Sequence, residues 1–395
     1  MLTVFSDIIK SEIIIVEFDL SSEFDLDESI TYLNHAAVGV WPRRTRDAIV
    51  AFADENYHRG AAGYPAWMQT ERALREQFRL LLNAASVDDI AIVKNTSEAL
   101  SFVAYGLPWR AGDNVVSIQE EFPSNRIVWE SLVTRGVQSK QISLTENIAS
   151  PEEAIIESLD ARTRLLSVSS VQYARGFKLD LVRLGDACQE RGILFCVDAI
   201  QSIGAELLDV QAIKADFVMA DGHKWMLGPE GVAVFYVAGK ARDSLQLSQY
   251  GWHMVEAMHD FDNRDWQVAT SARRFECGSP NMLGIQALHA SLSLLLELGM
   301  NKVANKVKQN TEYLHQRIQQ HDRLTLLSDT RPERYAGIVS FTMPGQDMAA
   351  VHDFLMKRGV ICAPRGGGIR FSPHFYNSVD DLNRAIQILE QFPGS

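Results

Sequence analysis

The chain has few cysteines, no histidine pair in helical register and no long apolar run, and each scarcity excludes a class of site or structure. Four cysteines occur in 395 residues, without metal-ligand spacing: Cys188, Cys196, Cys277 and Cys362. They suit a reducing compartment better than a disulfide framework. None of the ten histidines forms an HxxxH pair, so the sequence predicts no metal site. No apolar stretch reaches the length that a membrane span needs.

Positive charge is also in short supply. The chain carries 50 acidic against 38 basic residues and a net charge of −12. A nucleic-acid partner needs a basic surface to meet its phosphates, so this balance argues against one. We therefore expect no nucleic-acid and no membrane partner, and a cytoplasmic location.

What the chain does have is alternation of short apolar runs with amphipathic helical patterns. Between Ile90 and Val237 this pattern predicts an α/β fold with a mainly parallel sheet that is covered on both faces. After Ser271 the character changes, which predicts a smaller C-terminal α/β domain. The expected division is an N-terminal arm at 1–35, a large domain at 36–285 and a small domain at 286–395.

One lysine lies between two strand-like segments. The apolar run 216–220 is followed by Asp221, Gly222, His223 and Lys224, then by a turn and a second apolar run at 232–237. Lysine is rarely buried without a purpose, and a Schiff-base amine needs the lowered pKa that partial burial provides. A lysine that reaches solvent from a strand end is the alternative.

The motifs around this lysine are specific. The run Asp-Gly-His-Lys-Trp at 221–225, followed by Gly228-Pro229 and Gly231, resembles the cofactor-lysine segment of pyridoxal-phosphate (PLP) enzymes of aminotransferase class V. Upstream, the segment 195–204 resembles the same family's second anchor, and its Asp198 precedes the lysine by 26 residues. The resemblance is to the branch of cysteine desulfurases and isopenicillin N epimerases. It implies PLP fold type I.

The resemblance also implies roles around the cofactor ring. Lys224 is expected to carry PLP and to act as general base and acid. Asp198 is expected to keep the ring nitrogen protonated, which makes the ring an electron sink; a plain strand-end aspartate is the alternative. Gln201 would hydrogen-bond the phenolic oxygen, and His223 would donate to the phosphate.

A phosphate needs a helix N-terminus, where free N–H groups and the helix dipole meet an anion. Thr96 and Ser97 open a helix directly after a strand, and a simple helix cap explains the same residues. The family has its phosphate loop here. Ser279 stands where relatives often carry threonine, which reaches the phosphate of the neighbouring subunit. The resemblance therefore implies a homodimer with shared active sites.

Further positions follow from the resemblance alone. Phe122 is the candidate for stacking on the cofactor, with a core phenylalanine as the alternative. Gln172 is a candidate contact to a cofactor oxygen. Arg370 matches the arginine that binds the carboxylate of the amino-acid substrate. Asn34 and His58 belong to segments that lie near the substrate or the active site in relatives, with a strand-to-turn connection and an ordinary loop, respectively, as the alternatives.

The expected function is a PLP-dependent reaction on an amino acid through a Lys224 Schiff base, with class V lyase, aminotransferase or epimerase-like activity. A cysteine desulfurase or selenocysteine lyase is the alternative, and a catalytically idle binding protein on the same fold is another. A nicotinamide oxidoreductase is disfavoured because no GxGxxG turn follows the first strand. Cys362 ends an apolar run and only seven residues separate it from Arg370, so we predict that it carries no persulfide.

Overall fold

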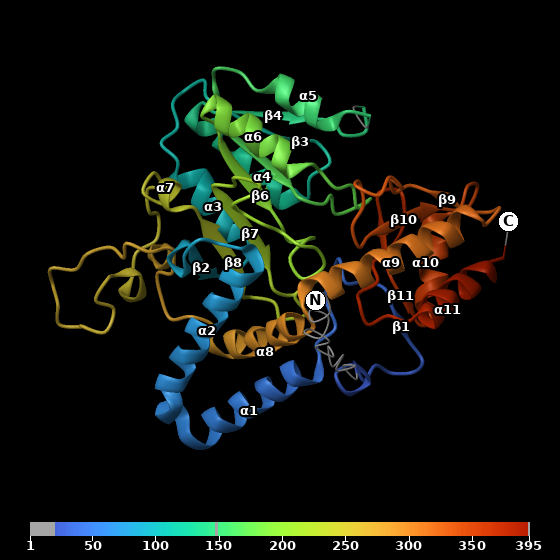
Figure 1. The fold of residues 1–395 in the computed structure, drawn as a ribbon, viewed down its shortest axis with the longest axis horizontal. Coiled ribbons are helices and arrows are strands. Elements are labelled where there is room, and N and C mark those ends of the chain that lie inside the picture. Colours follow the sequence, from blue (N-terminus) through green and yellow to red (C-terminus); the bar gives the residue numbers. More distant parts are fainter. Residues whose placement is uncertain (1–19, 147–148, 394–395) are drawn as a thin grey trace, which may run out of the picture.

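A computed structural model describes residues 20–146 and 149–393 of the chain. These residues form a large α/β part built on a seven-stranded sheet and a smaller α/β part that holds the C-terminus (Figure 1). In the large sheet the order is β2-β8-β7-β6-β5-β3-β4, and β8 alone runs antiparallel to its neighbours. The strands are β2 (Ile90–Val93), β3 (Asn114–Ile118), β4 (Gln138–Ile142), β5 (Thr163–Ser169), β6 (Leu194–Asp198), β7 (Phe217–Asp221) and β8 (Ala233–Val237).

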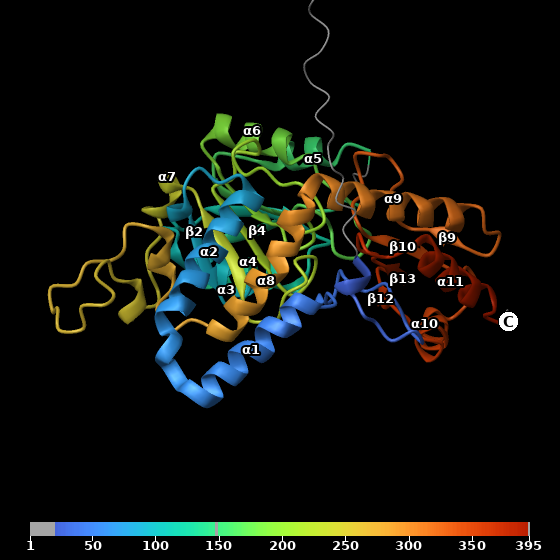
Figure 2. The same ribbon diagram turned by 60° about the horizontal axis from the view of Figure 1, so that its bottom comes forward.

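Helices cover both faces of this sheet. The connections through α5 and α6 step along the sheet in one direction and the connection through α4 steps in the other, so right-handed crossovers place them on opposite faces. Helices α1 and α8 lie side by side (Figures 1 and 2). The helices are α1 (Arg43–Arg59), α2 (Tyr64–Leu82), α3 (Thr96–Gly106), α4 (Pro123–Glu130), α5 (Pro151–Ser158), α6 (Leu181–Arg191), α7 (Gly239–Arg242) and α8 (Met282–Leu298). Short 3-10 helices occur at Leu20–Ser22, Gly60–Gly63, Val87–Asp89, Ser131–Arg135, Trp252–Met254 and Ala272–Phe275.

The smaller part has its own core and its own four-stranded antiparallel sheet, in the order β12-β13-β10-β9. A separate two-stranded parallel pair joins β1 to β11. Helix α9 (Met300–Gln319) contributes buried side chains to both cores of the molecule. The remaining elements are β1 (Thr31–Tyr32), β9 (Thr325–Leu326), β10 (Val339–Thr342), α10 (Met348–Lys357), β11 (Val360–Ile361), β12 (Ala363–Arg365), β13 (Gly368–Phe371) and α11 (Val379–Glu390).

The predicted α/β class and the mainly parallel, doubly covered sheet are confirmed. The predicted domain boundary after residue 285 falls inside α8, which packs on α1 and α2 of the large part. Of the predicted arm, residues 1–19 lie outside the described residues, and Thr31–Tyr32 forms β1, which pairs with β11 of the small part. The edge strand β4 escaped prediction because its sequence QSKQI is polar.

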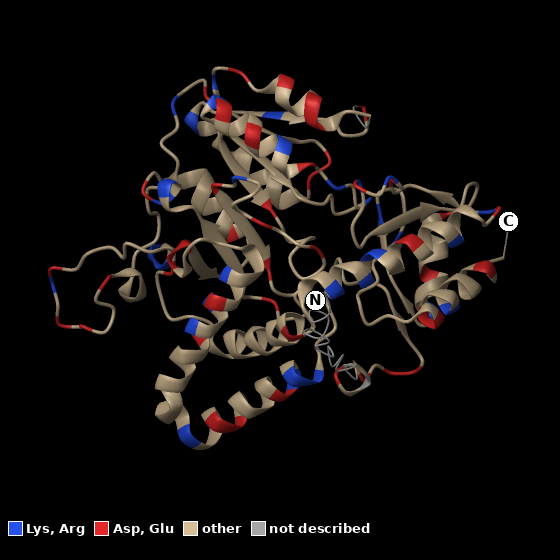
Figure 3. Cartoon of the chain, in the orientation of Figure 1, with Lys and Arg blue, Asp and Glu red and all other residues tan. Residues whose placement is uncertain are grey.

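Along α1, basic residues lie near the two ends and acidic residues lie between them (Figure 3). Among the described residues, no single helix is both long and apolar enough to cross a membrane. Helices α8 and α9 meet that test only when joined, and they are bent by 86° where they meet.

The carboxyl ends of the central strands prepare a site. The pairing of β5, β6 and β7 sets Ser169 opposite Asp198, and Asp198 opposite Met219, so that Asp198 and Asp221 end neighbouring strands at one edge of the sheet. In open α/β sheets ligands bind outside this edge.

Candidate active site

A pocket of about 410 Å³ opens at the carboxyl edge of β6 and β7, and Arg365 and Arg370 of the small domain also line it. It brings together eight residues that the sequence predicted for cofactor or substrate: Thr96, Ser97, Phe122, Asp198, Gln201, His223, Lys224 and Arg370. They come from segments up to 274 positions apart in the chain, from Thr96 to Arg370. Their convergence supports one shared site.

Lys224 lies in the turn after β7 and faces into this pocket. The chain at Gly39 crosses it closely, because the Gly39 N–H donates to the His223 carbonyl at 2.6 Å. A side chain at Gly39 would put its Cβ 2.2 Å from the Lys224 carbonyl oxygen, so only glycine fits there. Burial lowers the pKa of Lys224 to about 8, with Asp198 opposing and Arg370 assisting that shift. The Phe122 ring centre is 5.8 Å from its amine.

Asp198 is buried at the end of β6 and is held by two donors. Its Oδ2 accepts from the Asn125 side-chain amide at 2.6 Å, and its Oδ1 accepts from the Ile200 N–H at 2.9 Å. Burial raises the pKa of Asp198, and the Ile200 N–H, Lys224 and Asn125 oppose that rise. Asn125 was not predicted; its signal is a polar residue in the first turn of α4, fully buried.

The N-terminus of α3 has features of an anion-binding site. Asn95 caps the helix by accepting from the Glu98 N–H at 2.8 Å. The Thr96 hydroxyl is buried and has no hydrogen-bond partner. Ser97 donates its hydroxyl to Ser124 at 2.9 Å. A helix N-terminus with an unpartnered hydroxyl fits the phosphate of PLP.

Arg370 on β13 is 2% exposed, and in the described part of the chain it has no carboxylate partner. Its guanidinium donates only to neutral oxygens, the Tyr173 carbonyl at 2.7 Å and the Asn34 side chain at 3.4 Å, and its Nε is unpaired. Burial, followed by the nearby Arg365, lowers the pKa of Arg370 to about 10. A buried cation without an anion fits a ligand carboxylate. Asn34, predicted near the substrate, touches this arginine.

Gln201 lines the pocket and is already oriented. Its side-chain oxygen accepts from the Trp225 ring N–H at 2.8 Å, and its amide donates to the Ala36 carbonyl at 3.1 Å. Both contacts fix the side chain, and its second amide hydrogen remains for the role that the resemblance implies.

Besides Asn34, which contacts Arg370, three predicted residues do not line this pocket. Gln172 shapes its own loop, because its amide donates to the Glu120 carbonyl at 2.8 Å and its oxygen accepts from the Arg175 N–H at 2.7 Å. It lines a neighbouring cavity of about 620 Å³, which corrects its placement. His58 is exposed in the last turn of α1. Ser279 lines a third cavity, of about 390 Å³, and its role toward a neighbouring subunit stays a prediction.

Several pocket residues were missed. Tyr173 and Arg365 line the pocket, as does Asp221, the last residue of β7. Glu121 lies behind it, where its carboxyl accepts from the Ser169 N–H at 2.6 Å, and burial raises its pKa to about 7. Polar residues that follow strands are common, so only the fold distinguishes these.

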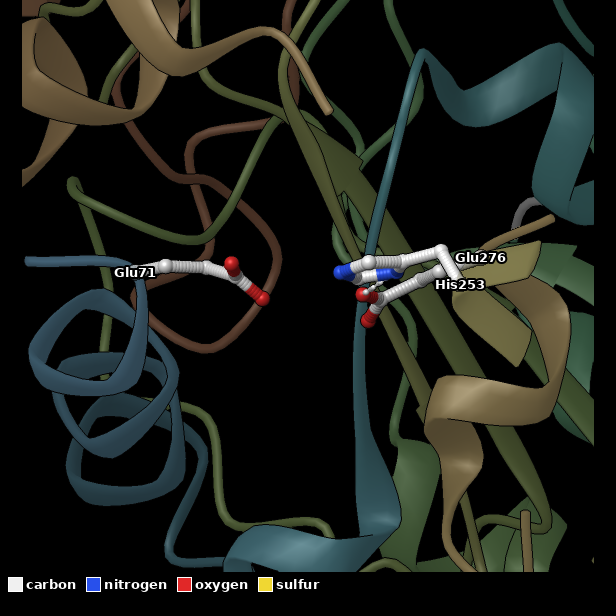
Figure 4. Close-up of side chains that lie close together, drawn as sticks. All are labelled: Glu71, His253 and Glu276. Atoms are coloured by element: carbon white, nitrogen blue, oxygen red, sulfur yellow. Dashed lines mark ion pairs between the residues drawn. The ribbon is translucent and has the colours of Figure 1, made fainter. Parts of the chain in front are cut away.

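One further polar cluster resembles a metal centre. Ligand atoms of Glu71, His253 and Glu276 lie within 4.8 Å of one another and are buried (Figure 4). The Arg75 guanidinium already bridges the two carboxylates, at 2.7 Å from Glu71 and 2.5 Å from Glu276. We therefore interpret this cluster as an internal ion-pair network and assign no metal to it.

Comparison with known proteins agrees with this geometry. The aminotransferase class-V family matches residues 31–384. The chain is 30% identical to a probable cysteine desulfurase of Methanothermobacter thermautotrophicus, with 95% of this chain and 98% of that protein covered. It is 29% identical to a cysteine desulfurase of Escherichia coli, with 84% and 82% covered.

Two solved structures share the fold. The apo cysteine desulfurase of Thermococcus onnurineus has a TM-score of 0.85 at 23% identity and covers 94% of this chain and 97% of its own. The cystine C–S lyase C-DES, in complex with its reaction product cysteine persulfide, has a TM-score of 0.86 at 22% identity, with 92% and 98% covered. The predicted resemblance and fold type are confirmed, and the chain belongs to the aminotransferase class-V family as a PLP-dependent enzyme of fold type I.

Proposed function

We propose that this enzyme is a carbon–sulfur lyase that cleaves the Cβ–S bond of a sulfur amino acid by elimination, without a persulfide on its own cysteine. Support for the substrate class comes from the relatives, which are named cysteine desulfurases and a cystine C–S lyase. Support for elimination comes from one observation: among the described residues that line the pocket, none is a cysteine.

Cys362 is the thiol nearest to Arg370 along the chain, and it lies in the core of the small domain. It is 3% exposed, and burial raises its pKa to about 12. The hairpin of β12 and β13 pairs Ala363 with Arg370, so the segment after Cys362 has no slack with which to swing a thiol into the pocket. A relay needs an exposed thiolate. Cys188 and Cys196 are buried as well.

The residues of the pocket suit elimination. PLP, when bound, withdraws electrons from a carbanion at the substrate's Cα. The Arg370 fork binds the substrate carboxylate and orients the molecule. The Lys224 amine takes the proton from Cα, and its lowered pKa of about 8 keeps part of it neutral near pH 7. Asn125 holds the Asp198 carboxylate as the partner of the ring nitrogen.

The products distinguish the two reactions. Elimination converts L-cysteine and water into pyruvate, ammonia and hydrogen sulfide. A persulfide relay instead transfers sulfur to an enzyme thiol and releases L-alanine. We expect pyruvate and ammonia in equal amounts. The Cys362→Ser and Cys277→Ser variants should keep activity close to that of the wild type. Alanine as the product, together with a persulfide trapped on either cysteine, would contradict the proposal.

A second cation at the pocket indicates which sulfur amino acid fits best. Arg365 lines the pocket and is exposed, and its described contact is the carbonyl of Pro364. Because Arg370 serves one carboxylate, Arg365 is placed for a second. We therefore propose L-cystine, which with water yields pyruvate, ammonia and cysteine persulfide. Arg365→Leu should lower kcat/KM for cystine more than for cysteine; an equal loss for both would contradict this preference.

We also propose that the enzyme is a homodimer with shared active sites. Ser279 and His58 lie outside the pocket of their own chain. Aromatic side chains are exposed, Tyr57 at 84% and Phe261 at 76%, as contact residues would be in a single chain. Sedimentation tests the mass. Mixing inactive Lys224→Ala with inactive Ser279→Ala protein should restore activity if the sites are shared.

A cytoplasmic location is proposed as well. It rests on the scattered cysteines, of which three of the four are buried free thiols, Cys188, Cys196 and Cys362. Fractionation of the source cells tests it, and recovery of the enzyme in an oxidising compartment would contradict it.

A further inference from the structure

A carboxyl group lies inside the predicted phosphate site. Asp221 ends β7, and its Oδ1 accepts the Thr96 N–H at 3.2 Å, at the start of α3. Its side chain is 12% exposed and lines the same pocket as Ser97 and His223. The Thr96 N–H, at the helix N-terminus that a phosphate would use, thus already donates to an acid of this chain.

Independent features mark this place as an anion site. Helix α3 has 11 residues, long enough for its terminus to attract an anion. Thr96 is 5% exposed and lines the pocket, and its buried hydroxyl has no hydrogen-bond partner. A buried hydroxyl without a hydrogen-bond partner destabilises the fold unless a ligand supplies that partner.

The charged groups around Asp221 determine its protonation state. On its own turn lie His223, whose Nδ1 is 3.8 Å from Oδ2, and Lys224. Asp198 on β6 and Glu230 add negative charge. Burial, followed by Asp198, raises the pKa of Asp221 to about 7. Burial lowers the pKa of His223 to about 4, so that imidazole is neutral near pH 7 and supplies no counter-charge.

A phosphate monoester carries about −1.5 to −2 charges near pH 7. A carboxylate against it would repel, whereas a protonated carboxyl donates a hydrogen bond. We infer that Asp221 is a phosphate-binding residue that acts in its protonated form, so that binding of the cofactor phosphate takes up one proton at this carboxyl. The inference rests on the proposed PLP site and adds to it a residue and a pH dependence.

The sign of the effect follows from linkage. Below about pH 7 the carboxyl of the free protein is already protonated, and binding needs no proton. Above the pKa of Asp221 the carboxyl must gain a proton on binding, so affinity should fall roughly tenfold for each pH unit. The phosphate loses its own second proton near its pKa of about 6. This ionisation affects affinity in the opposite direction, and it is nearly complete below the pH range in which Asp221 loses its proton.

The test uses pyridoxine 5′-phosphate, which lacks the aldehyde and so cannot react with Lys224. Titration calorimetry at about pH 7 and about pH 8.5, in buffers of different ionisation enthalpy, gives both affinity and protons taken up. For the wild type we expect about tenfold or more loss of affinity over this interval, and uptake of about one proton at the higher pH. The isosteric Asp221→Asn should bind at least about tenfold more tightly than the wild type at the higher pH, without that extra proton.

Controls separate the causes. Pyridoxine, which has no phosphate, should bind wild type and Asp221→Asn equally. Lys224 loses charge near pH 8 in both proteins, so only the difference between them reports Asp221. Asp221→Ser, with thermal unfolding of the apo protein, guards against a misfolded first variant. Equal pH profiles in wild type and both variants, or weaker binding by both variants at every pH, would overturn the inference. Failure of the wild type to bind either PLP or pyridoxine 5′-phosphate would instead overturn the proposed PLP site.

Discussion

The molecule contains two buried arginines in opposite circumstances. Arg75 on α2 lies between the carboxylates of Glu71 and Glu276 and also donates to the Ile90 carbonyl at 2.7 Å (Figure 4 shows the two glutamates). Arg370 on β13 is buried as well, but its described partners are neutral oxygens. One guanidinium is balanced by its own chain, and the other is left for a ligand.

The pKa shifts report the same difference. Glu276 and Glu71 raise the pKa of Arg75 even against the effect of burial. At Arg370 burial prevails, and the pKa falls to about 10. Removing one partner of a buried ion pair strongly destabilises the protein, because the other charge stays buried without compensation. A buried charge that has no partner in the native protein already lowers its stability. Buried charge alone therefore does not mark a functional site; the missing partner does.

The largest effect is expected from the pocket's own amine. Lys224→Ala should lose at least about a thousandfold of pyruvate formation, because it removes the group that moves the Cα proton. It should also lose the bond to PLP that borohydride makes permanent, measured by peptide mass. The matched control is Lys240→Ala, whose lysine is on the surface. A reducible bond to PLP that persists in Lys224→Ala would contradict the assignment.

Removing Arg75 from its ion pairs with Glu71 and Glu276 should lower the stability of the fold and leave catalytic activity unchanged. Arg75→Met strands two buried glutamates, and we expect the free energy of unfolding to fall by about 3–5 kcal/mol. Urea unfolding of the apo protein measures it. The control is Arg79→Met one turn later on the same helix, where the ion pair with Glu76 is exposed to water and little should change. If the two variants were equally stable, the buried ion pairs of Arg75 would contribute no more to the free energy of unfolding than an exposed pair.

The two clusters also show what sequence reasoning can reach. Motif residues such as Lys224, Asp198 and Arg370 were predicted because their neighbours along the chain are distinctive, and the structure brings them together. Asn125 and Asp221 were missed, since each acquires its meaning only from a contact across the fold, 73 positions away to Asp198 and 125 positions away from Thr96.

Gln172 shows the opposite error. It lies on a loop next to Tyr173, which does line the pocket, so a shift of one residue separates the prediction from the structure. A strand or helix has a period that fixes which side chains point inward. A loop has none, and its hydrogen bonds decide the direction of each side chain.

Removing the unbalanced arginine should have the reverse effect to Arg75→Met. Arg370→Leu should weaken amino-acid binding about tenfold to a hundredfold, the equivalent of about 1.5–3 kcal/mol for a charged hydrogen-bond pair. PLP binding and the unfolding midpoint should stay the same or rise, because a buried, uncompensated charge is lost. Spectral titration with substrate and thermal unfolding measure the two quantities. Arg370→Lys should lie between, as it keeps the charge and loses the fork.

The smallest effect is expected at Cys362, which lies in the small-domain core directly after β11 and does not line the pocket. Cys362→Ser places a hydroxyl among apolar side chains, so the free energy of unfolding should fall by about 1 kcal/mol, while kcat stays within about twofold. Cys362→Ala removes the thiol without adding the polar group and separates the two causes. If the thiol carried sulfur, both variants would be inactive even though the alanine variant stayed folded. Retained pyruvate formation in both would instead place the chemistry on Lys224 and Arg370 and leave Cys362 as a packing residue.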